Sequence, residues 1–213
     1  REAFNDFNKA LLLKACNAYF FKVRGTVFYK MGQHENAVQD FTWAIALEPD
    51  RFDLYDLRGN AYFETDRYGQ ALEDYNRAIG IYPQSADTLN RRGAIHLKYG
   101  RYEQALSDFN TVIALNPGYY KAYNNRANVY SRTGRYRLAM EDLNHALRLE
   151  PGYVSARFNR GILLAQTGQN QKAVEDFSRV IQNKPDDVNA YNSRASLYMN
   201  TGQIEAGCAD ARK

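Results

Sequence analysis

The chain has 213 residues, 45% of them hydrophobic and 24% charged, so its composition allows a buried core and excludes a disordered chain. Lys and Arg total 28 against 24 Asp and Glu, and this net charge of +4 is too small to indicate a nucleic-acid partner. The longest apolar runs have about four residues, as at 10–13, which excludes a membrane-spanning helix.

A period of 34 residues runs through the chain and sets the order of the expected elements. Rows of small, aromatic and charged residues keep this step, and so do all five prolines: Pro49, Pro83, Pro117, Pro151 and Pro185. One helix pair of such a repeat cannot bury its apolar stripe alone, so neighbouring pairs must stack on each other.

In chain order, the period predicts the second helix of a preceding repeat at 1–17, then full repeats at 18–51, 52–85, 86–119, 120–153 and 154–187. A partial repeat follows at 188–213. The chain starts without Met, inside one predicted helix, and stops inside another. We therefore expect it to be part of a longer protein, and no signal peptide can be judged.

Each repeat is expected to contain two amphipathic helices. In the second repeat, Tyr55, Gly59 and Tyr62 form one stripe and Ala71 and Tyr75 form part of the next. Gly59 and Ala71 are small, which lets the two backbones approach closely. A glycine ends the first helix and the proline ends the second.

These motifs resemble the tetratricopeptide repeat family over the whole chain. The pattern of aromatic, small and aromatic residues recurs at Tyr123, Ala127 and Tyr130. The resemblance implies an all-α fold, a right-handed superhelical α-solenoid of antiparallel helix pairs, as a single array over 1–213. It also implies that the first helices line a concave groove and the second helices the outer face.

Two further rows carry charge and lie 16 residues apart in each repeat. The arginines are Arg24, Arg58, Arg92, Arg126, Arg160 and Arg194, and the aspartates are Asp6, Asp40, Asp74, Asp108, Asp142, Asp176 and Asp210. An arginine row could bind an anionic ligand. Because every arginine has a matching aspartate, we favour pairs that hold each hairpin together.

The sequence contains no P-loop, dinucleotide fingerprint, zinc-protease motif or calcium loop. We therefore predict a non-catalytic protein without a cofactor or metal site. Cys16 and Cys208 would lie at opposite ends of a solenoid and are not expected to pair. Free thiols slightly favour the cytoplasm, but two cysteines are too few to decide the compartment, and a periplasmic or exported location stays open.

The binding surface is expected on the solvent-facing positions of the first helices. The N-terminal half carries an acidic cluster of Asp53, Asp56 and Asp87, which would suit a basic partner. The C-terminal half is rich in Asn, with Arg157 among its few charges. The predicted peptide-binding residues are Asn90, Arg91, Lys121, Asn124, Asn125, Asn128, Asn159 and Asn192.

Two binding modes of the family can be compared with these positions. The clamp that holds a chaperone's carboxylate tail requires Lys, Asn and Arg in a fixed register, and no window of this chain supplies them. Asn125 and Asn159 resemble the asparagine ladder in the repeats of O-linked N-acetylglucosamine transferase, which grips a peptide backbone. The ladder is interrupted at Val23, Leu57, Arg91 and Ser193. Asn as an ordinary polar surface residue stays an equal alternative.

The sequence thus favours a scaffold that binds a peptide or helix of another protein in its groove. The alternative is a regulatory or targeting arm of a larger enzyme whose catalytic domain lies outside this segment. RNA binding is a third interpretation, which the groove aspartates disfavour. We expect no nucleic acid and no membrane span, with self-association through exposed solenoid ends left open.

Overall fold

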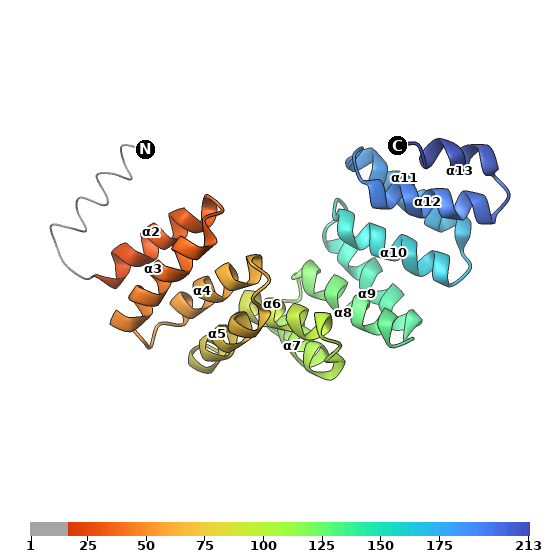
Figure 1. The fold of residues 1–213 in the computed structure, drawn as a ribbon. Helices are drawn as coiled ribbons and strands as arrows, with labels where there is room; N and C mark the ends of the chain where they lie inside the picture. Colours follow the sequence, from red (N-terminus) through yellow and green to blue (C-terminus); the bar gives the residue numbers. More distant parts are fainter. Residues whose placement is uncertain (1–16) are drawn as a thin grey trace. The chain divides into compact units, whose positions relative to one another are not determined.

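The computed structural model describes residues 17–213, which form twelve α-helices and no strand (Figure 1). The helix expected before Asn17, and Cys16, lie outside these residues. The first helices are α2 (Ala18–Lys30), α4 (Phe52–Glu64), α6 (Ala86–Lys98), α8 (Tyr120–Arg132), α10 (Val154–Gln166) and α12 (Val188–Asn200). The second helices are α3 (His34–Leu47), α5 (Tyr68–Ile81), α7 (Tyr102–Leu115), α9 (Tyr136–Leu149), α11 (Asn170–Asn183) and α13 (Ile204–Asp210).

The helices end where the sequence predicts. Helix α3 stops two residues before Pro49, because the residue before a proline avoids the helical region. The first helices end in a turn whose last residue has a positive φ. Glycine fills this position in five described repeats, while Asp66, with φ of 58°, is the one other such residue between 17 and 213.

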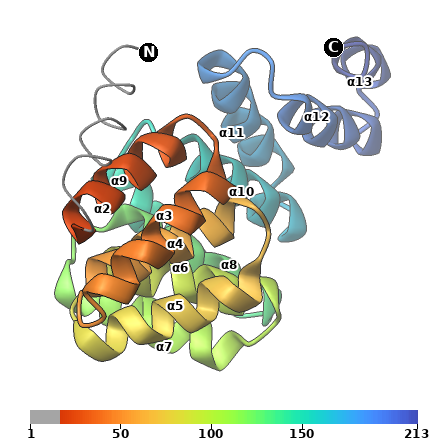
Figure 2. The same cartoon turned by 60° about the vertical axis from the view of Figure 1, so that its left-hand side comes forward.

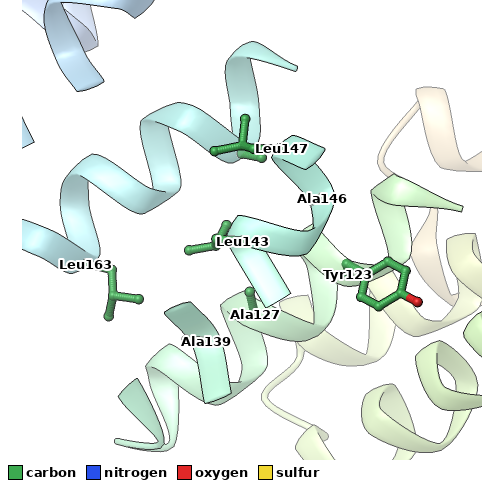
Figure 3. Close-up of a cluster of buried hydrophobic side chains, with 8 residues drawn as sticks. Tyr123, Ala127, Ala139, Leu143, Ala146, Leu147 and Leu163 are labelled. Atoms are coloured by element: carbon green, nitrogen blue, oxygen red, sulfur yellow. The ribbon is translucent and has the colours of Figure 1, made fainter. Parts of the chain in front are cut away.

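The size of the facing side chain decides whether glycine or alanine stands at a helix contact. A Cβ added to Gly59 would lie 2.7 Å from the Tyr75 ring, and one added to Gly161 would lie 2.8 Å from the Phe177 ring. In the equivalent place on α8 stands Ala127, and the residue opposite is Leu143 rather than an aromatic (Figure 3). The smaller leucine leaves room for the extra methyl group.

The arginine and aspartate rows pair inside the hairpins, which confirms that prediction. In five of these pairs the arginine donates Nε and Nη2 to both oxygens of its aspartate at 2.6–2.8 Å. The pairs are Arg24–Asp40, Arg58–Asp74, Arg126–Asp142, Arg160–Asp176 and Arg194–Asp210. The hydrogen bond to Asp142 raises the pKa of Arg126 above its ordinary value. The arginines therefore serve the framework.

The same arginines also reach back to the preceding repeat, a link that the sequence analysis missed. Nη1 of Arg126 donates to Asn110 Oδ1 at 2.7 Å, and Nη1 of Arg160 donates to Asn144 Oδ1 at 2.8 Å. The acceptors keep the 34-residue step: Thr42, Asn76, Asn110, Asn144 and Ser178. Arg58, Arg126, Arg160 and Arg194 thus connect their own hairpins with the preceding ones.

The chain divides into two compact units, unit 1 (Arg1–Ile95) and unit 2 (His96–Lys213), with the boundary inside α6. In unit 1, α2 packs on α3, α3 on α4 and α4 on α5; in unit 2, helices α7 to α13 pack in succession. Figure 2 shows α2 beside α3 and α12 beside α13. The all-α repeat array is confirmed. The superhelix, the single array over 1–213 and the Arg92–Asp108 pair across the boundary stay predictions.

Candidate functional site

The predicted binding residues of unit 2 lie on three successive first helices. Helix α8 carries Lys121, Asn124, Asn125 and Asn128, α10 carries Asn159, and α12 carries Asn192. Helix α10 contacts both α8 and α12, so these side chains belong to neighbouring helices of one unit. We call the five asparagines the amide surface: Asn124, Asn125, Asn128, Asn159 and Asn192.

The amides differ in exposure and in their partners. Asn192 is exposed and, within residues 17–213, no hydrogen bond engages its side chain, whereas Asn124 is only 4% exposed. Asn159 Nδ2 donates to Asn124 Oδ1 at 2.8 Å, and Asn124 Nδ2 donates to Asn125 Oδ1 at 3.4 Å. The notion of freely solvated amides is therefore wrong for Asn124 and Asn159. Their hydrogen bonds orient them across two helices before any ligand arrives.

A hollow of about 560 Å³ lies between α10 and α12; we call it the α10–α12 hollow. Its apolar lining comes from Ile162, Ala165, Phe177 and Leu197. The rest of its lining is polar but uncharged: Gln166, Asn170, Asn192, Ser193, Ser196 and Asn200. This size and composition are typical of sites that take an apolar group and hold it with a few hydrogen bonds.

A second hollow, of about 370 Å³, lies toward the N-terminal ends of the same two helices. Phe158 and Asn159 line it from α10, and Asn189 lines it from α12. Lys184 and Asp187 also line it, and their charges pair with each other at 3.5 Å. The two charges that line this hollow are therefore paired with each other, while Lys121 on α8 is exposed.

Asn90 and Arg91 belong to unit 1, whereas the six other candidates belong to unit 2. Asn90 is 9% exposed and Arg91 is half-buried on α6. The sequence analysis predicted that both line one groove with the asparagines of unit 2. Because they belong to a different unit, their part in such a shared groove stays a prediction.

The acidic cluster of unit 1 is already engaged with its own neighbours. Asp53 accepts hydrogen bonds from Lys22 and Arg51, each at 2.6 Å. Burial alone would raise the pKa of Asp53, but these two cations outweigh it and lower the pKa below its ordinary value. A basic partner would have to displace both cations to reach this carboxylate.

A hydrogen-bond chain leads from the core of unit 1 to a second carboxylate. Tyr75 donates its hydroxyl to Asn60 Oδ1 at 2.8 Å, and Asn60 donates to Asp56 at 3.1 Å. Thr88 donates to the other oxygen of Asp56 at 2.6 Å. Burial raises the pKa of Tyr75, which keeps its proton in place as the donor. Asp56 therefore serves the structure of unit 1.

Arg157 does not lie in the groove, contrary to the prediction from sequence. It is 8% exposed, and its Nη2 donates to the carbonyl oxygen of Pro151 at 2.6 Å. Tyr55, in the same register, donates to the carbonyl oxygen of Pro49. Burial lowers the pKa of Arg157, although the nearby Asp176 opposes this effect. Arg157 thus replaces a structural tyrosine.

No cluster of three or more His, Cys, Asp or Glu residues within 17–213 is arranged to hold a metal ion. In the same part of the chain, no helix has both the length and the apolar character needed to cross a membrane. The described residues thus define a class: an α-helical repeat protein whose first helices carry polar side chains.

Family models identify this class further. Models described as tetratricopeptide repeat match residues 23–86, 124–188 and 158–206, and a second one matches 86–119. The chain therefore belongs to the tetratricopeptide repeat family, which confirms the resemblance. Repeats of this family are generally non-catalytic modules that bind other proteins, so membership indicates a protein-interaction scaffold.

Solved structures share the fold at low sequence identity. A tetratricopeptide repeat protein from Parabacteroides merdae is 24% identical (TM-score 0.76), covering 91% of this chain and 77% of its own. PilW, a type IV pilus biogenesis factor, is 18% identical (TM-score 0.83; 91% and 90% covered). YrrB, described as having an unusual peptide-binding site, is 21% identical (TM-score 0.68; 86% and 95% covered). No curated protein matches this chain.

Proposed function

We propose that the amide surface of unit 2 binds an extended peptide segment of a partner protein. The observation that supports this is the hydrogen bond from Asn159 to Asn124, which orients amides from two neighbouring first helices. A side-chain amide carries both a donor and an acceptor, the same pair that every peptide unit presents. Amides in a row therefore suit a ligand that is recognised through its backbone.

The chemistry of the surrounding groove agrees with this ligand class. Lys121 is the exposed cation of the candidate set, so a strongly charged ligand would find few counter-charges among these residues. YrrB, which shares the fold, is described as having a peptide-binding site, and this supports a peptide as the ligand class here.

Several amides must act together. One amide–backbone hydrogen bond contributes about 0.5–1.5 kcal/mol net, which alone gives no useful affinity. Loss of two such bonds is expected to weaken binding tenfold or more, on the order of 1.4 kcal/mol.

The experiment selects peptides from a displayed random library on the full chain and measures their affinity for variants by fluorescence anisotropy. Asn125→Ala with Asn159→Ala is expected to weaken binding at least tenfold. Because Asn159 also bonds to Asn124, this variant should unfold slightly more easily. Asn192→Ala removes no hydrogen bond within residues 17–213, and should weaken binding with an unchanged melting temperature.

The matched control is Asn36→Ala on the second helix α3, where the exposed Asn36 side chain bonds, among residues 17–213, only to Gln33. It should leave peptide affinity unchanged. Equal binding by the control and the groove variants would show that the amide surface is not the site.

A further inference from the structure

Helix α10 breaks a polar row that the other first helices keep. Phe158 stands in a register occupied elsewhere by Lys22, Asp56, Asn90, Asn124 and Asn192. Ile162, one helical turn later, stands in a register occupied elsewhere by Thr26, Asn60, Ala94, Asn128 and Ser196. Two large apolar side chains thus replace polar or small ones on the helix at the centre of the amide surface.

Both side chains are half-buried and pack at the edge of the core of unit 2. The Phe158 and Phe177 rings lie 5.6 Å apart between centroids, and both Phe158 and Ile162 contact the cluster that includes Leu164 and Leu197. Ile162 and Phe177 also line the α10–α12 hollow. The apolar break therefore coincides with an open, partly apolar cavity.

Charge around the hollow restricts what could fill it. None of its lining side chains is charged, whereas the hollow between α9, α10 and α11 on the other side of α10 is lined by Arg160, Lys172, Glu175 and Asp176. A charged group in the α10–α12 hollow would lose water without gaining a counter-charge, which is unfavourable. An apolar group would meet Ile162 and Leu197 instead.

We infer that the α10–α12 hollow is an anchor pocket for an uncharged apolar side chain of the bound peptide. This inference rests on the proposed function, because the peptide backbone beside the anchor would be held by Asn159 and Asn192. Ser193 and Ser196 offer hydroxyl groups at the rim for the same backbone. The partner is thus an extended segment with an apolar residue among polar ones.

The test is a double-mutant cycle with a library-selected peptide. Changing the peptide's apolar residue to Ser is expected to weaken binding to the unchanged protein at least tenfold, or 1.4 kcal/mol. Ile162→Asn should cause a similar loss with the original peptide. Binding of the Ser-substituted peptide should be nearly the same with and without Ile162→Asn, because the anchor contact is already absent.

Val174→Asn is the matched control. Val174 is half-buried and packs against the same core cluster, but it does not line the α10–α12 hollow. It should leave peptide affinity unchanged even where it lowers stability. Ser196→Trp is a second test that spares the core, since Ser196 is exposed at the rim and the new ring would fill the hollow. It is expected to weaken binding at least tenfold.

The outcomes separate the anchor from the proposed function. Peptides that lack an enriched apolar residue, or that bind the Ile162→Asn and Ser196→Trp proteins normally, overturn the anchor. If such peptides still lose affinity with Asn125→Ala and Asn159→Ala, the proposed function stands without it. Peptides whose affinity changes with neither the anchor variants nor the asparagine variants overturn both the anchor and the proposed function.

Discussion

The first helices of the two units present different chemistry on the same framework. In unit 1, Lys22 pairs with Asp53 at 2.6 Å and Tyr29 donates to Glu64 at 3.4 Å, so charged side chains there are engaged by their neighbours. In unit 2, the corresponding surface carries asparagines and serines, with Phe158 and Ile162 among them. Both units contain the paired arginine and aspartate rows. Structural and binding positions thus vary independently.

This difference teaches where specificity can reside in such an array. Arg126 contacts Asp142 in its own hairpin and Asn110 in the preceding helix, so any change there disturbs two repeats. Asn192 has no such constraint, because no side-chain hydrogen bond holds it among residues 17–213. Asn192 can therefore change without loss of a hydrogen bond between repeats, whereas a change at Asn159 removes its bond to Asn124.

The largest expected effect tests whether the framework is equal in both units. Asp142→Ala in unit 2 and Asp74→Ala in unit 1 each leave a partly buried arginine without its carboxylate. Each should lower the free energy of unfolding by about 3–5 kcal/mol. Urea unfolding followed by circular dichroism measures the loss.

Two companions sharpen this experiment. Adding Arg126→Leu to Asp142→Ala should recover part of the loss, because the unpaired charge is removed. Arg137→Ala breaks an exposed pair with Glu141 and should cost less than about 1 kcal/mol. A small loss for Asp74→Ala beside a large one for Asp142→Ala would show that the units do not share one framework.

A medium effect is expected at the helix contacts. Gly161→Ala places a Cβ 2.8 Å from the Phe177 ring and should destabilise the protein by about 1–3 kcal/mol. In a Phe177→Leu background the same change should cost less, because it recreates the pair of Ala127 and Leu143. Thermal unfolding of the four proteins gives the coupling; equal costs in both backgrounds would contradict the ring-size argument.

The smallest effect concerns the turn after α4. Asp66 has a left-handed φ of 58°, where Gly134 of unit 2 has 74°. Asp66→Gly relieves strain but loses the hydrogen bond from the Tyr68 hydroxyl, so we expect a gain of at most about 1 kcal/mol. Gly134→Asp should have the opposite sign. The measurement is the melting temperature of each variant, and a shift in the same direction for both substitutions would disprove this reasoning.

Much of the helical framework could be predicted because the relevant interactions are local or periodic. Pro49 and its equivalents predicted the ends of the second helices, and the 16-residue spacing predicted the pair of Arg126 and Asp142. The link from Arg126 to Asn110 was missed, although the acceptor row keeps the same period. Thr42 and Ser178 stand at the two ends of that row and Asn stands between them, so no single residue type marks it.

The candidate site was less predictable, because a register tells which face a residue lies on but not what its side chain contacts. Arg157 looked like a groove cation until its bond to the Pro151 carbonyl placed it in the interior. Asn124 and Asn159 looked like separate solvated amides, and the structure joins them at 2.8 Å.

The sequence by itself determined the repeat length, the helix pairs and the family, since a strict period forces each pair to bury the same stripe on its neighbour. Only the tertiary structure decided which polar side chains are already engaged in hydrogen bonds or ion pairs within the protein. Lys22 and Arg51 pair with Asp53, and the Thr88 hydroxyl donates to Asp56, each at 2.6 Å. The hollow beside Ile162 likewise depends on the tertiary structure, because side chains from three packed helices, α10, α11 and α12, line it.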